Sequence, residues 1–259
     1  MKARSLLPVT NMFVRYPAAL LAAALLPLAL SACGDKGSET KIEKIAAGEN
    51  VPPPEGKQWS DVVSATPELG FVMGNPDAPA KLVEFGSYTC SHCRDFTAEA
   101  SEPLRKMVDT GRLSYEFRSF LRDPFDISMS LITRCGGPEP FFPLTEQMFG
   151  NQNAFFEKAQ SLDQKAIEAA GNQPLDKRFI TLAEMAGLID FAKQRGISED
   201  KVRQCLADAK TSEALVESVQ KASQQYDITG TPTFLLNGSV VKDVATWQLL
   251  RPKLQEAGL

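Results

Sequence analysis

The stretch Lys81–Arg94 reads K-L-V-E-F-G-S-Y-T-C-S-H-C-R, and it decides the fold. Its apolar run, Leu82–Phe85, has the length of a buried strand and stops at a Gly-Ser pair. The following segment, Asp95–Val108, carries apolar residues at nearly helical spacing. Cys90 and Cys93 therefore form a C-x-x-C motif at the junction between a predicted strand and a predicted helix.

This junction suits thiol–disulfide chemistry. The start of a helix has unpaired N–H groups and the positive end of the helix dipole, which stabilise a thiolate at Cys90. Two intervening residues let Cys93 approach Cys90 with little strain. A zinc half-site also uses C-x-x-C, but a structural zinc ion needs four ligands. The other three cysteines are distant in the sequence and the one histidine lies inside the motif, so we expect a redox pair and no metal.

The composition is that of an ordinary globular protein. Of 259 residues, 43% are hydrophobic and 23% are charged, which is enough for a sizeable core. The formal net charge is −4, and the sequence has no basic stripe interleaved with aromatic residues, so nucleic acid is not an expected partner. The length fits one large domain or one domain with an insertion.

The N-terminus has the pattern of a secretion signal. Basic residues without acids precede an apolar run, Tyr16–Leu30, which is too short for a comfortable membrane span. The run ends in Leu30-Ser31-Ala32-Cys33, which resembles a bacterial lipobox, in which the cysteine is lipidated. The alternative is an ordinary signal peptide with an unrelated cysteine nearby. We expect residues 1–32 to be a signal peptide and Cys33 to be acylated, which makes the protein a periplasmic lipoprotein on the inner or the outer membrane.

Residues 33–67 are polar and rich in proline, and they show no sustained periodicity. This composition predicts a flexible tether, partly extended at Pro52–Pro54. Such a tether would let a folded domain reach its substrates some distance from the lipid surface.

Further strands are expected on both sides of a long gap. Phe71–Gly74 predicts a short strand. The alternating segment Leu113–Phe120 predicts a strand parallel to the one before the C-x-x-C motif, because a helix separates those two strands. Beyond residue 225, Gly230–Gly238 predicts a strand that turns at its Asn-Gly pair into Ser239–Lys242. A closing helix follows near the C-terminus.

Residues 122–225 separate these two halves and predict a helical insertion. Three segments within it show helical spacing, and the last begins with an N-cap signature. These segments are Gln152–Ala170, Asp176–Arg195 and Ser198–Tyr226, with breaks expected at Gly171, Gly187 and Gly196. Four apolar residues near the start of the insertion could add a substrate surface, but helical core is the more common role for such residues. They are Phe125, Met129, Phe141 and Phe142.

Together these motifs resemble the DsbA-like family, whose members have a thioredoxin fold. The residues that carry the resemblance are Phe85–Cys93 and the distant Gly230–Phe234, which reads G-T-P-T-F. The resemblance implies an α/β fold with a mixed central sheet flanked by helices, formed by residues 68–121 and 226–259, and an inserted all-helical subdomain between them. In that family the second motif holds a cis-proline, here Pro232, that faces the active disulfide.

The motif and the resemblance assign roles to individual residues. Cys90 is the expected nucleophile, and His92 between the cysteines is expected to stabilise its thiolate. Glu84 matches a buried acid that transfers protons at the second cysteine, here Cys93, and the alternative is an exposed carboxylate on an edge strand. The residues expected to line the substrate groove are Thr231, Pro232 and Thr233.

Cys135 and Cys205 lie in the insertion. In an oxidising compartment they form either a structural disulfide or two buried thiols. Because Cys33 is expected to be lipidated and Cys90 to pair with Cys93, we expect a structural disulfide that closes a loop of ~70 residues.

These observations predict an extracytoplasmic thiol:disulfide oxidoreductase without a cofactor. We expect it to oxidise cysteine pairs of exported proteins and to exchange electrons with a membrane redox partner. One alternative is an isomerase or reductase kept reduced by a membrane donor. Thr231 before the proline resembles isomerase-type relatives, although no dimerisation domain is visible. Ser91 departs from the C-P-H-C of many DsbA-like proteins, which bears on the redox potential rather than on the reaction type.

An alternative from a different class is a copper-handling assembly chaperone. It would use Cys90, Cys93 and His92 as ligands for a soft metal ion. The sequence has no Met-rich or His-rich tract, and this disfavours the alternative.

Overall fold

A mixed six-stranded sheet forms the centre of the computed structural model, which describes residues 44–45 and 48–259. The strands lie in the order β1-β2-β4-β3-β5-β6. Their bounds are Val63–Ala65 (β1), Phe71–Gly74 (β2), Ala80–Gly86 (β3), Leu113–Ser119 (β4), Thr233–Leu236 (β5) and Ser239–Val241 (β6). β3 and β4 are parallel, and the other neighbouring pairs are antiparallel. The predicted parallel pair and the predicted hairpin of β5 and β6 are confirmed.

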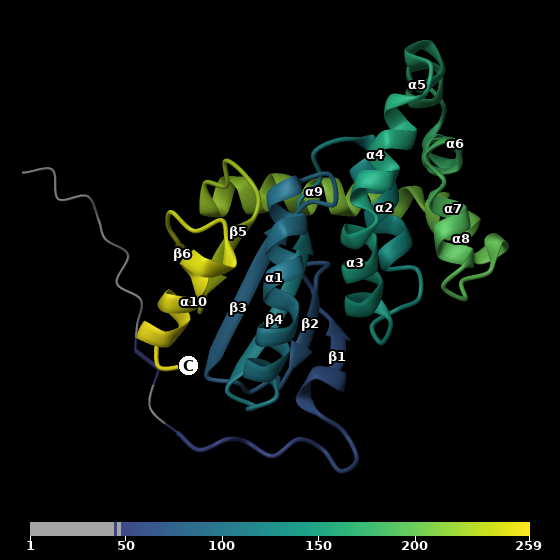
Figure 1. Ribbon diagram of the computed structural model, residues 1–259. Helices are drawn as coiled ribbons and strands as arrows, with labels where there is room; N and C mark the ends of the chain where they lie inside the picture. The colour runs from purple at the N-terminus through teal and green to yellow at the C-terminus, as the bar shows by residue number, and fades with distance from the viewer. Residues whose placement is uncertain (1–43, 46–47) are drawn as a thin grey trace, which may run out of the picture. The chain divides into compact units, whose positions relative to one another are not determined.

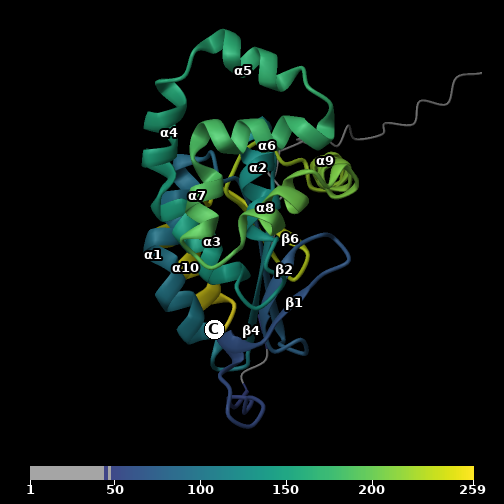
Figure 2. The ribbon, with the colours of Figure 1, turned by 90° about the vertical axis from the view of Figure 1, so that its right-hand side faces the viewer.

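Helices cover both faces of this sheet (Figures 1 and 2). α1 (Ser91–Val108) and α10 (Trp247–Glu256) lie on one face, and α9 (Ala209–Tyr226) crosses the other. Leu82 of β3 belongs to the large core under α1, whereas Val83 packs with residues of α9 and β5. Because successive side chains of a strand point to opposite faces, the face of Leu82 is also the face toward which Glu84 points.

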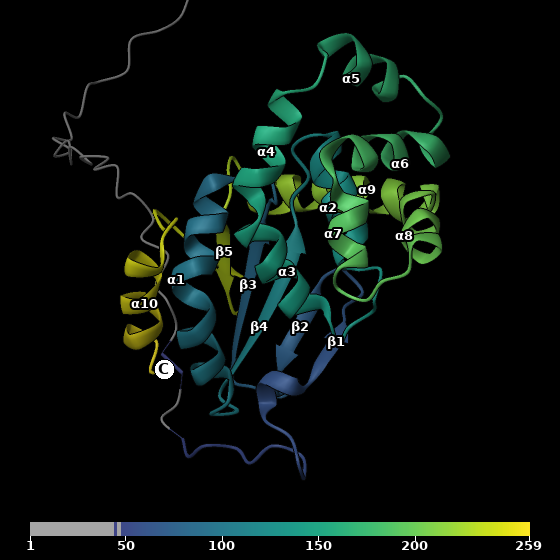
Figure 3. The same cartoon turned by 45° about the vertical axis from the view of Figure 1, so that its right-hand side comes forward.

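The insertion begins with α2 and ends in α9. Its helices before α9 are α2 (Pro124–Thr133), α3 (Phe141–Gly150), α4 (Gln152–Gln160), α5 (Gln164–Gly171), α6 (Leu175–Ala186), α7 (Leu188–Lys193) and α8 (Glu199–Leu206). α3 packs against α1. α4, α5 and α6 rise beyond the end of the sheet at which α1 starts (Figures 1 and 3). The insertion therefore lies close to the C-x-x-C motif.

Each of the three predicted helical segments is divided in two, and the break predicted at Gly187 is confirmed. The segments are Gln152–Ala170, Asp176–Arg195 and Ser198–Tyr226. Gly187 ends α6 with a φ of 77°, a conformation that favours glycine. Asp163 and Asp208 each accept a hydrogen bond from a backbone N–H at the start of α5 and α9, so each begins a new helix. The helical character and the break at Gly187 were predicted, whereas the divisions at Asp163 and Asp208 were not.

The predicted tether up to residue 67 is wrong in its C-terminal part. A 3-10 helix, η1 (Trp59–Asp61), and β1 already belong to the folded domain, and β1 pairs with β2. The buried Trp59 donates from Nε1 to the carbonyl oxygen of Val51 at 2.7 Å. The backbone N–H of Ile45 donates to the carbonyl oxygen of Ala257 at 2.8 Å. Two buried apolar side chains, Trp59 and Ile45, thus anchor a segment that composition alone assigned to a tether.

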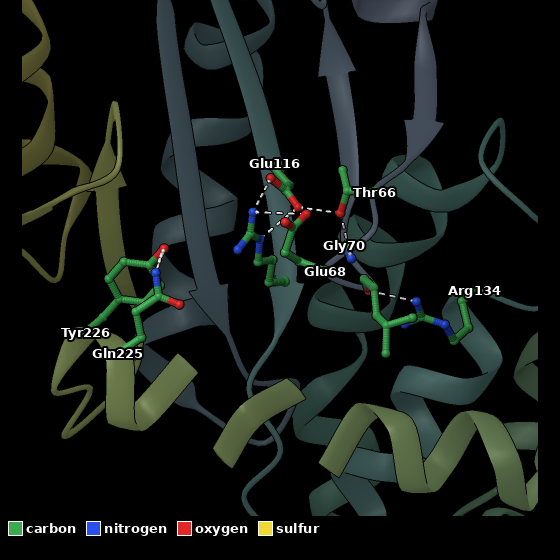
Figure 4. A network of polar contacts seen from close by, with 9 residues as sticks. Thr66, Glu68, Gly70, Glu116, Arg134, Gln225 and Tyr226 are labelled. Atoms are coloured by element: carbon green, nitrogen blue, oxygen red, sulfur yellow. Dashed lines mark hydrogen bonds and ion pairs between the residues drawn. The ribbon is translucent and has the colours of Figure 1, made fainter. Parts of the chain in front are cut away.

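A polar network ties the turn between β1 and β2 to β4 (Figure 4). The Thr66 hydroxyl donates to Glu116 Oε1 at 2.6 Å. Arg118 pairs with Glu116 at 2.8 Å and with Glu68 at 3.7 Å. Because Glu116 is only 8% exposed, these partners compensate the loss of water around its charge. The network holds the N-terminal hairpin on the sheet, which again places the start of the folded domain before residue 67.

The expected signal peptide at residues 1–32 and the expected lipidation site Cys33 lie outside the described residues. In the part of the chain that the structure describes, no helix combines the length and the apolar character that a membrane span requires.

Candidate functional site

The C-x-x-C motif lies between the end of β3 and the first turn of α1. Cys90 is the N-cap residue of α1, with extended backbone angles (φ −98°, ψ 120°), and Cys93 is in the first turn. At Gly86, the last residue of β3, a Cβ atom would lie 2.4 Å from the Phe117 ring, so the end of the strand has room only for glycine. Cys90 is 4% exposed and Cys93 is 0% exposed. Cys90 is therefore the thiol that a substrate can approach.

The loop before β5 brings Thr231 against Cys90. The Thr231–Pro232 peptide bond is cis, as the resemblance implies. The Cys90 Sγ–H donates to the carbonyl oxygen of Thr231 at 3.2 Å, although 141 positions separate the two residues in the sequence. On the buried side, the Ser87 N–H donates to Cys93 Sγ at 3.5 Å. The two motifs that are distant in the sequence thus form one site.

The surroundings of Cys90 favour its thiolate. Hydrogen bonding with the Cys93 side chain lowers the pKa of Cys90 to about 5, with burial opposing it and the Thr231 side chain and the backbone N–H groups of Cys93 and His92 assisting. These N–H groups belong to the first turn of α1, where helix donors are unpaired. In this structure the Cys90 side chain accepts no capping hydrogen bond from the N–H groups at the start of α1. A thiolate would therefore give the helix end an acceptor that the thiol does not supply.

Cys93 and Glu84 are in the opposite situation. Burial raises the pKa of Cys93 well above its ordinary value, and hydrogen bonding with Cys90 and the charge of Glu84 add to this effect. Burial also raises the pKa of Glu84 to about 8, although the Tyr115 hydroxyl donates a hydrogen bond to Glu84 Oε2 and opposes the shift. Glu84 Oε1 is buried and has no hydrogen-bond partner within the described residues. A carboxyl group of this kind can exchange a proton close to neutral pH.

His92 is exposed on the first turn of α1. Its backbone N–H contributes to the lowered pKa of Cys90. The predicted stabilisation of the thiolate by the imidazole stays a prediction.

The other predicted cysteine pair lies in the insertion. Cys135 and Cys205 are joined by a disulfide, with their Cα atoms 5.7 Å apart. Cys135 follows α2 and Cys205 lies in α8, so the bond joins two regions of the insertion. Cys90 and Cys93, in contrast, are free thiols in this structure.

An open pocket of about 390 Å³ is lined in part by Thr231, whose carbonyl oxygen accepts the hydrogen bond from Cys90. Its walls are the loop before β5 and the loop after β6, and they include the three residues predicted to contact substrate: Thr231, Pro232 and Thr233. Pro232 is buried, and the two threonines are half-buried. The pocket therefore runs along the cis-proline loop on the accessible side of the site.

Sequence reasoning missed three buried polar residues that contact the site. Tyr115 donates to Glu84, while Asp126 and Gln152 bond the loop that precedes Cys90. Tyr115 occupies an inward position of an alternating strand, so a search for polar neighbours of Glu84 could have found it. Asp126 and Gln152 look like ordinary residues in the first turn of two helices, and nothing in the sequence marks them as partners of the motif.

A thioredoxin family model matches residues 66–256 of the chain. Among solved structures, the chain is similar to a protein-disulfide isomerase from Novosphingobium aromaticivorans, with 31% identity, a TM-score of 0.70, and coverage of 73% of this chain and 98% of the other. It is also similar in fold to alpha-DsbA1 of Wolbachia pipientis, with 21% identity, a TM-score of 0.57, and coverage of 72% and 89%.

Sequence comparison finds similar proteins in several bacteria. Disulfide bond formation protein D of Bacillus subtilis is 23% identical over 203 residues, which cover 77% of this chain and 83% of the relative. A Rickettsia bellii relative, named as a candidate protein-disulfide oxidoreductase, is 26% identical over 66% of this chain. The match covers 58% of that relative, so the chain spans little more than half of its length.

Proposed function

Because the chain is a DsbA-like member of the thioredoxin family, we propose that it is a thiol:disulfide oxidoreductase that oxidises cysteine pairs of exported proteins. One observation carries this proposal. Cys90 is the more exposed of the two cysteines and its pKa is lowered to about 5, whereas the pKa of the fully buried Cys93 is raised. A site that stabilises the thiolate of its reduced form gives up its disulfide readily, because the disulfide is then less stable relative to the dithiol.

The first step starts from the Cys90–Cys93 disulfide. A substrate thiolate attacks Cys90 Sγ, a substrate–Cys90 disulfide forms, and Cys93 leaves as a thiolate. The high pKa of Cys93 means that this thiolate needs a proton. Glu84, with a pKa of about 8, is protonated at neutral pH and is the acid that we propose supplies it.

In the second step a second substrate thiolate attacks the substrate sulfur of the mixed disulfide. The substrate disulfide forms, and Cys90 leaves as a thiolate, which is the good leaving group that a low pKa provides. The substrate has lost two electrons and the Cys90–Cys93 pair has gained them. A membrane redox partner then accepts these electrons and restores the disulfide.

The substrate itself is proposed to bind along the cis-proline loop. Thr231, Pro232 and Thr233 line the pocket beside Cys90, and their backbone groups can bond an extended peptide. Such a peptide would place its cysteine opposite the Cys90 sulfur, which is the geometry that the first step needs.

The proposal is tested with purified protein in the disulfide form and a reduced, unfolded protein substrate. The proposal is supported if the substrate loses thiols while thiols appear at Cys90 and Cys93. The matched variant is Cys90→Ser, which leaves Cys93 and the fold in place. Absence of oxidation by the wild-type protein, or equal oxidation by the variant, would overturn the proposal.

A second candidate is a disulfide isomerase or reductase, which the name of the 31% identical Novosphingobium aromaticivorans protein favours. The two candidates share the site and differ in the direction of electron flow. Rapid acid trapping of the thiols in cells separates them. A largely oxidised Cys90–Cys93 pair supports the oxidase, and a largely reduced pair supports the isomerase or reductase.

We further propose that the protein acts outside the cytoplasm as a lipoprotein anchored through Cys33. The support is the N-terminal signal pattern followed by the lipobox-like Leu30-Ser31-Ala32-Cys33. Fractionation of cells tests it: the native protein should be found with membranes, and a Cys33→Ser variant should be released from them. Equal membrane retention of both would contradict the anchor.

A further inference from the structure

The loop that leads into the active site is held by side chains of the helical insertion. Gln152, the first residue of α4, is fully buried. Its Nε2 donates to the carbonyl oxygen of Tyr88 at 2.8 Å and to that of Cys90 at 2.9 Å. α4 lies on the side of the start of α1 (Figure 3). One amide group therefore fixes two carbonyl groups of the loop, including that of the reactive cysteine.

Asp126 of α2 holds the same loop through its donors. Asp126 is fully buried, and its carboxylate accepts from the Ser87 hydroxyl at 2.5 Å and from the Tyr88 N–H at 2.9 Å. Asp126 accepts hydrogen bonds from donors of the loop, and Gln152 donates hydrogen bonds to its carbonyl groups. Residues 87–90 are therefore held by the insertion through both their donors and their acceptors. Few conformations of the loop satisfy both partners at once.

The carbonyl group of Cys90 connects this clamp to the thiol chemistry. It also accepts the first hydrogen bond of α1, from the Arg94 N–H at 3.2 Å. Gln152 therefore helps to set the peptide plane at the N-cap, and with it the position of the Cys90 side chain relative to the unpaired N–H groups of the first turn.

Gln152 holds this position at a cost. Its Oε1 is buried without a hydrogen-bond partner among the described residues, which is unusual for a native interior and destabilising. If Gln152 served packing alone, an apolar residue would fill the space without this penalty. The two donated bonds account for the choice of glutamine.

We propose that Gln152 is a positioning residue of the dithiol site, which holds the carbonyl groups of Tyr88 and Cys90 so that the Cys90 sulfur stays at the N-terminus of α1 in the reduced protein. The inference rests on the proposed thiol–disulfide function and deepens it, because it gives the insertion a part in the chemistry. Without Gln152, two buried carbonyl groups lose a donor and the loop relaxes away from the helix end. The reduced form then loses part of its stabilisation.

The test compares Gln152→Leu with a matched control, Gln147→Leu. Gln147 is an exposed glutamine of α3 whose Nε2 also donates to a backbone carbonyl, that of Pro143 at 3.1 Å, outside the site. Two quantities are measured for each full-length variant: the pH at which the Cys90 thiolate forms, followed by its ultraviolet absorbance, and the equilibrium constant with glutathione.

For Gln152→Leu we expect the thiolate to form about one pH unit higher, and the equilibrium constant to shift about tenfold toward the disulfide, which corresponds to roughly 30 mV. Gln147→Leu should change neither quantity. Gln152→Glu keeps the shape but replaces the donating amide nitrogen with a carboxylate oxygen, which donates no hydrogen bond when ionised. It should therefore shift both quantities in the same direction, and it serves as the second variant if Gln152→Leu does not fold.

A change in thermal stability with wild-type values of both quantities would overturn the inference, because Gln152 would then be only a structural residue. Neither quantity depends on a protein substrate. Failure of the proposed oxidation of exported proteins would therefore be seen separately, as a wild-type protein that equilibrates with glutathione but does not oxidise an unfolded substrate.

Discussion

The chain contains two cysteine pairs in opposite situations. Cys90 and Cys93 are two residues apart and are free thiols, whereas Cys135 and Cys205 are 70 positions apart and are bonded. The first pair lies at a helix N-terminus, faces a cis-proline and has a buried carboxyl group that acts on it electrostatically. The second pair lies among the helices of the insertion. The two pairs thus differ in the surroundings of their sulfurs as well as in their separation along the sequence.

The largest expected effect comes from Cys93→Ser, which breaks the reactive pair and leaves Cys90 in place. Oxidation of substrates should fall by roughly 1,000-fold or more, because no Cys90–Cys93 disulfide can form. The Cys90 thiolate should still attack an added protein disulfide, and the mixed disulfide should persist because no second thiol resolves it. Electrophoresis without reductant detects this covalent complex. The control is Cys135→Ser, which keeps Cys93, so a mixed disulfide at Cys90 is resolved and should not accumulate.

Removal of the Cys135–Cys205 pair tests whether this bond has a structural role. The double variant Cys135→Ser, Cys205→Ser should lose about 2–5 kcal/mol in the free energy of unfolding, because its unfolded chain is no longer cross-linked. Denaturant unfolding measures the loss. The thiolate titration of Cys90 should stay at its wild-type midpoint, and a marked shift of this midpoint would show that the two pairs are not independent.

Glu84→Gln sharpens the difference between the two cysteines of the reactive pair. The variant cannot supply the proton that the leaving Cys93 thiolate needs, so the rate of substrate oxidation should fall roughly tenfold or more. Because burial raises the pKa of Glu84 to about 8, the wild-type rate should also fall on this account as the pH passes about 8. Rate measurements from pH 6 to 9 check both points. A variant with the wild-type rate and the same decline near pH 8 would exclude Glu84 as the acid.

The last prediction is a pH dependence that only the reduced protein has and that changes gradually with each pH unit. The pKa of Cys90 is lowered from 9.0 to about 5, so its contribution to stability is complete above the unfolded value and is lost as the pH falls toward about 5. In the disulfide form Cys90 does not titrate. The stability of the reduced form relative to the oxidised form should therefore rise with pH between these values, by at most about 1.4 kcal/mol per pH unit. Thermal unfolding of both forms at several pH values measures it, and a constant difference would contradict the lowered pKa.

The sequence allowed prediction of the thioredoxin-type frame because its signals are local. A short apolar run before C-x-x-C, an Asn-Gly turn and the Thr231-Pro232 motif each identify an element directly. The start of the folded domain could not be predicted in this way. Trp59 lies against Gly111 and Ile45 bonds Ala257, both distant in the sequence, while the neighbours of Trp59 and Ile45 have the composition of a linker.

The same distinction holds within the site. Cys90, Cys93 and Glu84 lie within ten positions of one another, so spacing was enough to nominate them. Asp126 and Gln152 reach the loop before Cys90 only because the insertion folds against it, across 38 and 62 positions of sequence in the bonds to Tyr88 and Cys90. Contacts of this kind depend on the packing of whole helices, which no local pattern encodes.

The most direct test of the account is the reduction potential of the Cys90–Cys93 pair, measured by equilibration with glutathione. A site that stabilises the Cys90 thiolate should be a strong oxidant, with a potential between about −180 and −120 mV. A potential of about −270 mV, the value typical of thioredoxin, would mean that the reduced form is not stabilised. That result would contradict the account.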